Sequence, residues 1–166
     1  MEWRNIILRI SVVVTTYNGK MHLEKQLLSL LQQERAPDEV LIFDDGSTDG
    51  TIELVQSFIR KNCLESWQFY VNAKRKGWKQ NFMEGLRKAA GDILFPCDQD
   101  DIWYPRKLAE MTAVMEQHPE IKLLACDYRV LYESGALKAT VYKKTPAETQ
   151  GLITRYGFTK HFFMNP

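Results

Sequence analysis

Three aspartates within four positions follow an apolar run of the chain. The stretch 97–103, CDQDDIW, comes directly after DILFP and contains Asp98, Asp100 and Asp101. Neighbouring carboxylates repel one another, and a packed interior rejects them unless water, a cation or hydrogen-bond donors offset the charge. The stretch is therefore either a solvated turn or part of a ligand-binding site.

A divalent cation is the ligand that suits this acidic stretch. Hard cations such as Mg²⁺ and Mn²⁺ take oxygen ligands and commonly bridge one or two protein carboxylates to substrate phosphates. If the chain is extended here, Asp98 and Asp100 point the same way, so that one could hold the ion while the other accepts hydrogen bonds from ribose hydroxyls. An acidic turn without a ligand is the alternative that this motif alone leaves open.

A second acid pair lies in the segment 42–51, IFDDGSTDGT. The latter half of this segment is typical of a turn, in which Gly46 reverses the chain and one of residues 47–49 caps a following helix. That interpretation does not account for Asp44 and Asp45. An aspartate at a strand end can accept a hydrogen bond from a nucleobase imino group, so the pair suits a pyrimidine nucleotide.

Any phosphate of such a nucleotide has to be neutralised without the common glycine-rich cradles. The sequence contains neither GxGxxG nor GxxxxGK[ST], which excludes the usual dinucleotide fingerprint and the Walker-type loop. A metal held by carboxylates would supply the positive charge. A basic cluster, Lys74, Arg75, Lys76 and Lys79, could also face a diphosphate or an anionic membrane surface, but we favour a solvated start of a helix for it.

Strands and helices alternate along the chain and place these polar residues at strand ends. The apolar and β-branched runs predict strands at 9–17, 39–45, 67–73, 92–98 and 122–132, and the helical periodicity predicts helices at 21–34, 47–62, 78–91 and 105–118. Repeated strand-helix units imply an α/β fold whose parallel sheet has helices on both faces. Ligands of such sheets bind at the carboxyl ends of the strands, where residues 15–18, the acid pair and the acidic stretch would meet.

Composition narrows the classes of protein and partner. The 166 residues fit a single domain, 1–166, and 45% hydrophobic and 26% charged residues are typical of a soluble globular protein. A net charge of +1 argues against a nucleic-acid partner. The apolar segment 6–14 is interrupted by Arg9 and is shorter than the roughly 20 residues of a membrane-spanning helix. No secretory leader precedes it, so we expect a cytoplasmic protein.

Four motifs, in this order and spacing, resemble the family 2 glycosyltransferases of the GT-A fold. They are SVVVTTYNG, VLIFDDGSTDGT, NAKRKGWKQNFMEGLRKAAGDILFPCDQDDIW and PRKL, and the resemblance covers about residues 9 to 130. The variant DQDDIW is most similar to the bacterial rhamnosyltransferase-type branch, which builds cell-surface polysaccharides. The resemblance implies a Rossmann-like, three-layer α/β/α fold with a mostly parallel sheet.

The resemblance also implies an activity and a set of site residues. The activity is transfer of a sugar from a UDP- or dTDP-linked donor to a hydroxyl of a saccharide or lipid-linked saccharide acceptor, with inversion at the anomeric carbon and with Mn²⁺ or Mg²⁺ as cofactor. By position, the base pocket would be lined by Thr15, Tyr17 and Asp45. The ribose would be bound by Asp98, and the metal would be bound by Asp100 together with Asp98. Four further positions match the family's pattern near the nucleotide-sugar: Asn18, Asp44, Gly77 and Asn81.

The general base is the part of the reaction that the sequence does not locate. Inverting transfer needs a base within hydrogen-bond reach of the acceptor hydroxyl, and in the family it lies downstream of the acidic motif, in an acceptor-binding part. We therefore expect a chain truncated before that part, with the base beyond Pro166. A longer protein could also associate with the inner face of the membrane. Nothing in the context of Asp127, Glu148 or His161 selects one of them as the base.

Two other classes of protein stay open. A response-regulator receiver is also doubly wound, but it has its acid pair after the first strand and a phosphorylatable aspartate after the third. Here the pair follows the second strand and FYVNA carries no acid. A non-catalytic sugar-nucleotide-binding module would keep the donor contacts without turnover, and nucleotide titrations with and without Mn²⁺ test the contacts on which both interpretations depend.

Overall fold

The computed structural model describes residues 7–126, 129–131 and 137–139. They belong to two compact units, Met1–Leu124 and Ala125–Pro166. Among these residues, the first unit holds four strands and four helices, and the second holds two short strands. All the residues predicted to bind the nucleotide-sugar or the metal lie in the first unit.

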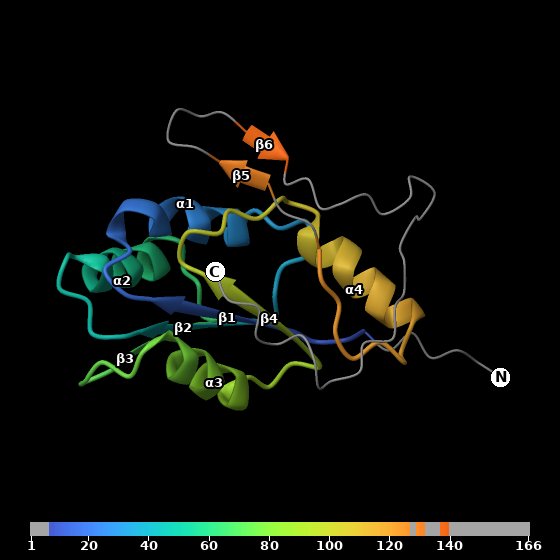
Figure 1. Ribbon diagram of the computed structural model, residues 1–166, viewed down its shortest axis with the longest axis horizontal. Coiled ribbons are helices and arrows are strands. Elements are labelled where there is room, and N and C mark those ends of the chain that lie inside the picture. The colour runs from blue at the N-terminus through green and yellow to red at the C-terminus, as the bar shows by residue number, and fades with distance from the viewer. Residues whose placement is uncertain (1–6, 127–128, 132–136, 140–166) are drawn as a thin grey trace. The chain divides into compact units, whose positions relative to one another are not determined.

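Four parallel strands form the sheet of the first unit, in the order β3-β2-β1-β4 (Figure 1). The strands are β1 (Ile10–Thr16), β2 (Glu39–Asp44), β3 (Trp67–Val71) and β4 (Ile93–Asp98). The four strands predicted for this part of the chain are confirmed. Because all four run the same way, their carboxyl ends share one side of the sheet, which we call the carboxyl edge.

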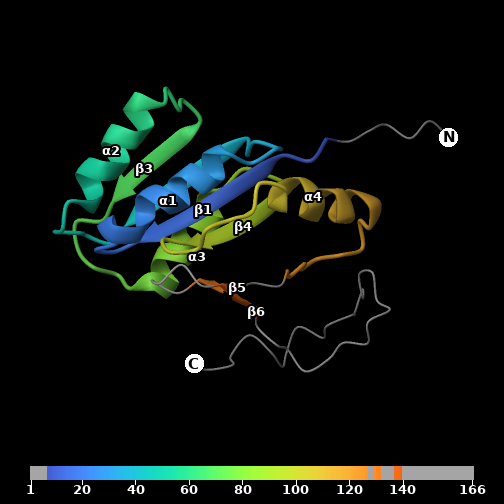
Figure 2. The ribbon, with the colours of Figure 1, turned by 90° about the horizontal axis from the view of Figure 1, so that it is seen from above.

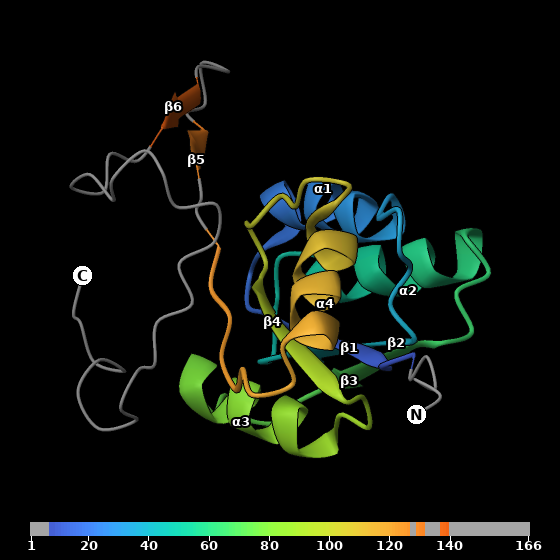
Figure 3. The same ribbon diagram turned by 90° about the vertical axis from the view of Figure 1, so that its right-hand side faces the viewer.

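Helices cover both faces of this sheet, so the predicted three-layer α/β/α arrangement is confirmed. The helices are α1 (Lys20–Leu31), α2 (Thr51–Lys61), α3 (Trp78–Lys88) and α4 (Lys107–Gln117). Helices α1 and α2 lie on one face and α3 lies on the other (Figure 2). Helix α4 lies on the side of the sheet opposite to α3 (Figure 3). Its Leu108 belongs to the same apolar cluster as buried residues of α1 and α2.

Strand β1 is the centre of the core, because all seven of its residues are buried. Its side chains alternate between the faces, as they must in a strand. Val12 and Val14 pack in the larger cluster with α1, α2 and α4, whereas Val13 packs in the smaller cluster under α3. Each valine fully buried in this way contributes about 1.5 kcal/mol or more to folding. The strand end that carries Thr15 and Thr16 is therefore held rigidly.

The strand order reverses between β1 and β4. From β1 the chain moves outward through α1 to β2 and through α2 to β3, and α3 then returns it over the opposite face to β4, on the other side of β1. Such a reversal marks the point where ligands of open α/β sheets bind. The register pairs Thr15 with Asp98 across this point and Thr16 with Asp44 on the other side of β1.

The strand predicted at 122–132 is wrong for residues 122–126, which are not in a strand. Arg129–Leu131 (β5) is a strand and pairs antiparallel with Leu137–Ala139 (β6) in the second unit. Residues 127, 128 and 132 lie outside the described residues. An apolar run alone does not provide the partner strand that a sheet requires. The candidate bases Asp127, Glu148 and His161 lie outside the described residues.

In the residues that the structure describes, no helix combines the length and the apolar character needed to cross a bilayer.

Candidate functional site

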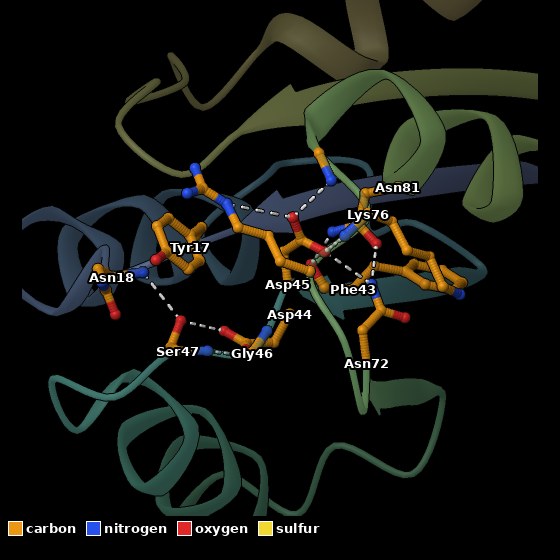
Figure 4. Close-up of polar contacts among 12 residues, drawn as sticks. Tyr17, Asn18, Phe43, Asp44, Asp45, Gly46, Ser47, Asn72, Lys76 and Asn81 are labelled. Carbon is orange, nitrogen blue, oxygen red and sulfur yellow. Dashed lines mark hydrogen bonds and ion pairs between the residues drawn. The ribbon is translucent and has the colours of Figure 1, made fainter.

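Asp44 organises the turn that follows β2. Its side chain is fully buried and accepts hydrogen bonds from the backbone N–H groups of Gly46 (3.0 Å) and Ser47 (2.8 Å) and from the Ser47 hydroxyl (2.5 Å) (Figure 4). Gly46 has a φ of 83°, a left-handed conformation that glycine adopts without strain. The structure thus gives Asp44 a turn-forming role, and its contact with a nucleotide-sugar stays a prediction.

Asp45 binds the loop between β3 and α3. Its buried carboxylate accepts hydrogen bonds from the backbone N–H groups of Lys76 (2.7 Å) and Gly77 (2.8 Å) and from Nδ2 of Asn72 (3.1 Å). Burial acts to raise the pKa of Asp45, but these hydrogen bonds and the nearby Arg75 outweigh it and leave the pKa below the ordinary 3.8. Asp45 is therefore an ionised carboxylate that fixes the loop at the carboxyl edge.

Asn81 stabilises the contact between Asn72 and Asp45. It is buried, its Oδ1 accepts from Nδ2 of Asn72 (2.7 Å), and its own Nδ2 donates to the carbonyl oxygen of Phe43 (3.0 Å). Asn81 thus orients Asn72, which in turn binds Asp45 (Figure 4). Gly77, the N-cap residue directly before α3, has a φ of 85°. Direct contact of Asn81 or Gly77 with a donor remains a prediction.

Arg75 stacks on the ring of Tyr17. Its guanidinium carbon lies 3.9 Å from the ring centroid, and its Nε lies 3.9 Å from Oδ2 of Asp45. A planar cation on this ring shows that the ring face can accept a flat group. The interpretation of the basic cluster as a solvated helix start did not include this stacking of Arg75 on Tyr17. The signal that could have found it was the single arginine among lysines, because arginine stacks on aromatic rings better than lysine does.

Asn18 joins the loop after β1 to the turn after β2. Its backbone N–H donates to the Ser47 hydroxyl (2.8 Å), and its Oδ1 accepts from the N–H of Thr48 (2.9 Å). Its φ of 47° lies in the left-handed region, where asparagine is enriched among non-glycine residues. Asn18 therefore fixes the segment that presents Tyr17, and its contact with the nucleotide-sugar stays a prediction.

The helix cap expected within residues 47–49 is wrong in position, because the N-cap residue of α2 is Gly50, and Asp49 stands directly before it. Its carboxylate accepts from the backbone N–H of Thr51 (3.0 Å), the first residue of α2, and from that of Lys20 (3.1 Å), the first residue of α1. One side chain thereby satisfies N–H groups at the beginnings of both helices.

The acidic stretch is a turn after Asp98, so the assumption of an extended chain through Asp100 is wrong. Strand β4 ends at Asp98, Gln99 and Asp100 lie in the turn, and the N–H of Asp101 donates to the carbonyl oxygen of Asp98 (3.3 Å). Burial first, and then the charges of Asp101 and Asp100, raise the pKa of Asp98, while a hydrogen bond with Thr15 opposes that rise. The turn thus concentrates negative charge beside the end of β1.

The chemistry of this turn fits a divalent cation. Its donors are carboxylate oxygens, and no ion pair within the described residues neutralises Asp98 or Asp100. No three aspartate, glutamate, histidine or cysteine side chains converge on one point in the part of the chain that the structure covers. An ion held here would need further ligands, and Mg²⁺ and Mn²⁺ commonly take them from substrate phosphates and water.

The predicted site residues form two groups at the carboxyl edge. Thr15 and Asp98 face each other where β1 and β4 end. Tyr17, Asp45 and Gly77 are brought together by Arg75 and by the loop between β3 and α3. The first group has the unneutralised charge, and the second has an aromatic surface beside a buried carboxylate.

Comparison with known families identifies most of the chain. The profile of the family described as Glycosyl transferase family 2 matches residues 11–156. Poly(ribitol-phosphate) beta-N-acetylglucosaminyltransferase TarS of Staphylococcus aureus is 28% identical over 155 residues, which is 92% of this chain and 26% of that protein. A glycosyltransferase of Mycoplasma pneumoniae is 31% identical over 137 residues, 81% of this chain and 46% of that protein. The chain thus spans less than half the length of these curated relatives.

Solved structures of glycosyltransferases share the fold. The crystal structure of S. aureus TarS 1–349 in complex with UDP-GlcNAc matches with a TM-score of 0.61 and 28% identity, over 68% of this chain and 32% of that one. The mannosyltransferase PcManGT from Pyrobaculum calidifontis, in complex with GDP-Man and Mn²⁺, matches with a TM-score of 0.61 and 28% identity, over 65% of this chain and 32% of that one.

Proposed function

The chain belongs to glycosyltransferase family 2, and we propose that it binds the donor of a metal-dependent, inverting sugar transfer. The observation that carries the proposal is the pairing of two features at one carboxyl edge. One is the Tyr17 ring beside the buried carboxylate of Asp45, and the other is the unneutralised acidic turn at Asp98 and Asp100. A nucleoside diphosphate needs both, since its base stacks and its phosphates require a cation.

The nucleoside is proposed to bind at the Tyr17 side. The ring of Tyr17 accepts a planar group. The guanidinium of Arg75, which stacks on this ring, would move together with the incoming base or stack on it. Asp45 and Thr15 complete this pocket, with Asn18, Asp44, Gly77 and Asn81 holding its walls. UDP and dTDP are the nucleotides that we favour. Because solved relatives contain UDP-GlcNAc and GDP-Man, uracil, thymine and guanine nucleotides should all be tested.

The diphosphate and the ribose are proposed to bind at the acidic turn. Asp98, which pairs with Thr15 where β4 and β1 end, would accept from ribose hydroxyls and share the ion with Asp100. Bound Mn²⁺ or Mg²⁺ would act as a Lewis acid that stabilises charge on the leaving diphosphate, an effect worth several kcal/mol. The guanidinium of Arg75 offers a further positive charge on the same edge.

The acceptor side of the reaction is proposed from the family resemblance. We infer a saccharide or lipid-linked saccharide acceptor in cell-surface polysaccharide synthesis, with rhamnose from dTDP as the favoured sugar. A general base from the acceptor-binding part, downstream of Asp100, would take the proton of the acceptor hydroxyl. The reaction would take place in the cytoplasm, at the inner face of the membrane.

Calorimetric titration of UDP, dTDP and GDP, with and without Mn²⁺, tests the donor site. We expect one nucleotide to bind at least about fivefold more tightly with Mn²⁺, a coupling of ordinary size between two ligands. Asp100→Ala should remove the metal dependence and leave weaker, metal-independent binding. Glu24→Ala, which deletes an exposed carboxylate on α1, is the matched control. A folded wild-type protein that binds none of the three nucleotides would contradict the proposal.

A further inference from the structure

The side chain of Gln99 crosses from the acidic turn to the end of β1. Its Oε1 accepts two hydrogen bonds, from the hydroxyl of Thr16 (2.9 Å) and from the backbone N–H of Tyr17 (2.9 Å). Gln99 lies between the two aspartates proposed to bind the ion, and Tyr17 is the residue proposed to stack on the base. One amide group therefore connects the two halves of the site directly.

The amide group of Gln99 also packs against Gly19. A Cβ atom on Gly19 would lie 2.2 Å from Oε1 and 2.6 Å from Cδ of Gln99, which is closer than real Cβ contacts. Thr16, one of the two donors to Gln99, is buried. The missing side chain of Gly19 thus leaves the space in which the Gln99 amide makes its two hydrogen bonds.

The link lies at the point where the strand order reverses. Strands β1 and β4 pair side by side with Thr15 opposite Asp98, and the Gln99 bonds continue that pairing beyond the last residues of the strands. Chain segments that diverge after such neighbouring strands open a crevice at the carboxyl edge. Gln99 bridges the two segments at the point where the diphosphate is proposed to bind.

Glutamine suits this position because it accepts two hydrogen bonds without adding charge. A glutamate would accept the same two bonds, but it would add a carboxylate next to Asp98, whose pKa the charges of Asp100 and Asp101 already raise. A methionine would fill a similar volume without the carbonyl acceptor, and it would leave the Thr16 hydroxyl and the Tyr17 N–H without this partner.

We propose that Gln99 is a positioning residue that couples nucleotide binding at Tyr17 to cation binding at Asp98 and Asp100. The proposal rests on the proposed donor site. When the aspartates close on an ion, the turn that carries Gln99 moves with them, and the two hydrogen bonds transmit the change to the backbone of Tyr17. Each ligand thereby favours the backbone arrangement that the other one needs.

The test measures the affinity for UDP, or for whichever of the three nucleotides binds, without Mn²⁺ and with saturating Mn²⁺, and takes the ratio as the coupling. We expect a wild-type ratio of at least about fivefold and a ratio lowered at least about twofold for Gln99→Met, in which the direct contact of the ion with the diphosphate remains. Gln99→Glu keeps both acceptor bonds and should retain most of the coupling. Gln56→Met makes the same substitution at an exposed position of α2 and should leave the ratio unchanged.

A residue that only supports the fold would give a different result. Loss of stability alone would weaken both affinities in parallel and preserve their ratio. A wild-type ratio in Gln99→Met, or equal loss of coupling in the methionine and glutamate variants, would overturn the proposal. Absence of nucleotide binding in the wild type would instead contradict the donor site itself, so the two failures are distinguishable.

A second variant and a metal-free measurement test the proposal even if Gln99→Met does not fold. Thr16→Val removes one of the two donors while preserving the buried volume, and we expect it to reduce the coupling in part. Hydrogen exchange at the Tyr17 amide, measured without ligand or metal, should be slow in the wild type and in Gln99→Glu and at least about tenfold faster in Gln99→Met. Equal exchange in all three proteins would show that the Gln99 bond is absent in solution.

Discussion

At the scale of single residues, Asp44 and Asp45 show how neighbours of the same type take different roles. Asp44 accepts from its own turn, within three positions, and such local bonds are what DDGS predicts. Asp45 accepts from Lys76 and Gly77, 31 and 32 positions away. The sequence indicates that a polar residue stands at this strand end, but only the fold determines which distant N–H groups it meets.

Asp45→Asn should destabilise the protein in a pH-dependent way. The amide would point an NH₂ group at backbone donors, and loss of charged hydrogen bonds of this kind costs about 2 kcal/mol in the free energy of unfolding. Because the folded pKa of Asp45 lies below its ordinary 3.8, the wild type keeps the advantage at neutral pH and loses it as the pH falls below that value. Urea unfolding between pH 3 and pH 7 measures the difference.

Glu24→Gln, at an exposed position of α1, is the control for this pH series. It should unfold like the wild type at every pH. A difference between wild type and Asp45→Asn that grows on acidification would contradict the role assigned to the ionised Asp45 carboxylate.

At the scale of elements, helix α3 is positioned by one glycine. A Cβ atom on Gly85 would lie 2.4 Å from Cγ1 of Val13 and 3.0 Å from Cε2 of Phe43, so the helix backbone lies directly against the sheet. Helix α3 starts at Trp78, immediately after the loop that Asp45 holds. The distance between helix and sheet therefore affects the geometry of the site.

Gly85→Ala should push α3 away from the sheet. Inserting a methyl group into a well-packed interface typically costs about 1 to 3 kcal/mol, and this outweighs the higher helix propensity of alanine. We expect a lower melting temperature together with weaker nucleotide binding, because the N–H of Gly77 moves with α3. Met83→Ala, at an exposed position of the same helix, should change neither property by much. A Gly85→Ala protein as stable as the wild type would contradict this packing.

Element prediction succeeded where a pattern was long and failed where it was short or needed a partner. The buried strands and the amphipathic helices up to residue 118 follow from apolar periodicity, which local sequence specifies. The segment 122–132 is apolar enough for a strand, but pairing is determined by the partner. Residues 122–126 form no strand, whereas β5 pairs with β6. The end of β4 at Asp98 was predicted, but the turn at Gln99 and Asp100 was not, because the hydrogen bond from Asp101 that closes it leaves no sequence pattern.

At the scale of the first unit, the alternation of strands and helices already places the site. A parallel sheet with a reversal in strand order brings the ends of β1, β2 and β4 to one edge, whatever the details of the loops. This is why residues 15–18, the acid pair and the acidic stretch could be named from the strand pattern, and Gly77 and Asn81 from the family resemblance, whereas the stacking of Arg75 and the bridge through Gln99 could not. Both depend on side-chain conformations that become definite only when the loops have met.

Ligand binding should stabilise the whole unit. A ligand that binds only the folded state at 100 times its Kd adds about 2.7 kcal/mol to the free energy of unfolding. We expect the favoured nucleotide with Mn²⁺ to raise the melting temperature more than the nucleotide and the ion do when their separate effects are added. Purely additive shifts, measured by calorimetry at fixed protein concentration, would contradict a shared site.

The central claim, a nucleoside diphosphate and a divalent cation at one carboxyl edge, is tested most directly by anomalous diffraction from crystals grown with Mn²⁺ and the favoured nucleotide. We expect an anomalous peak between the diphosphate and the carboxylate of Asp100, with the base against the ring of Tyr17. A nucleotide bound elsewhere on the sheet, or a peak remote from Asp98 and Asp100 while the nucleotide is in place, would contradict the account.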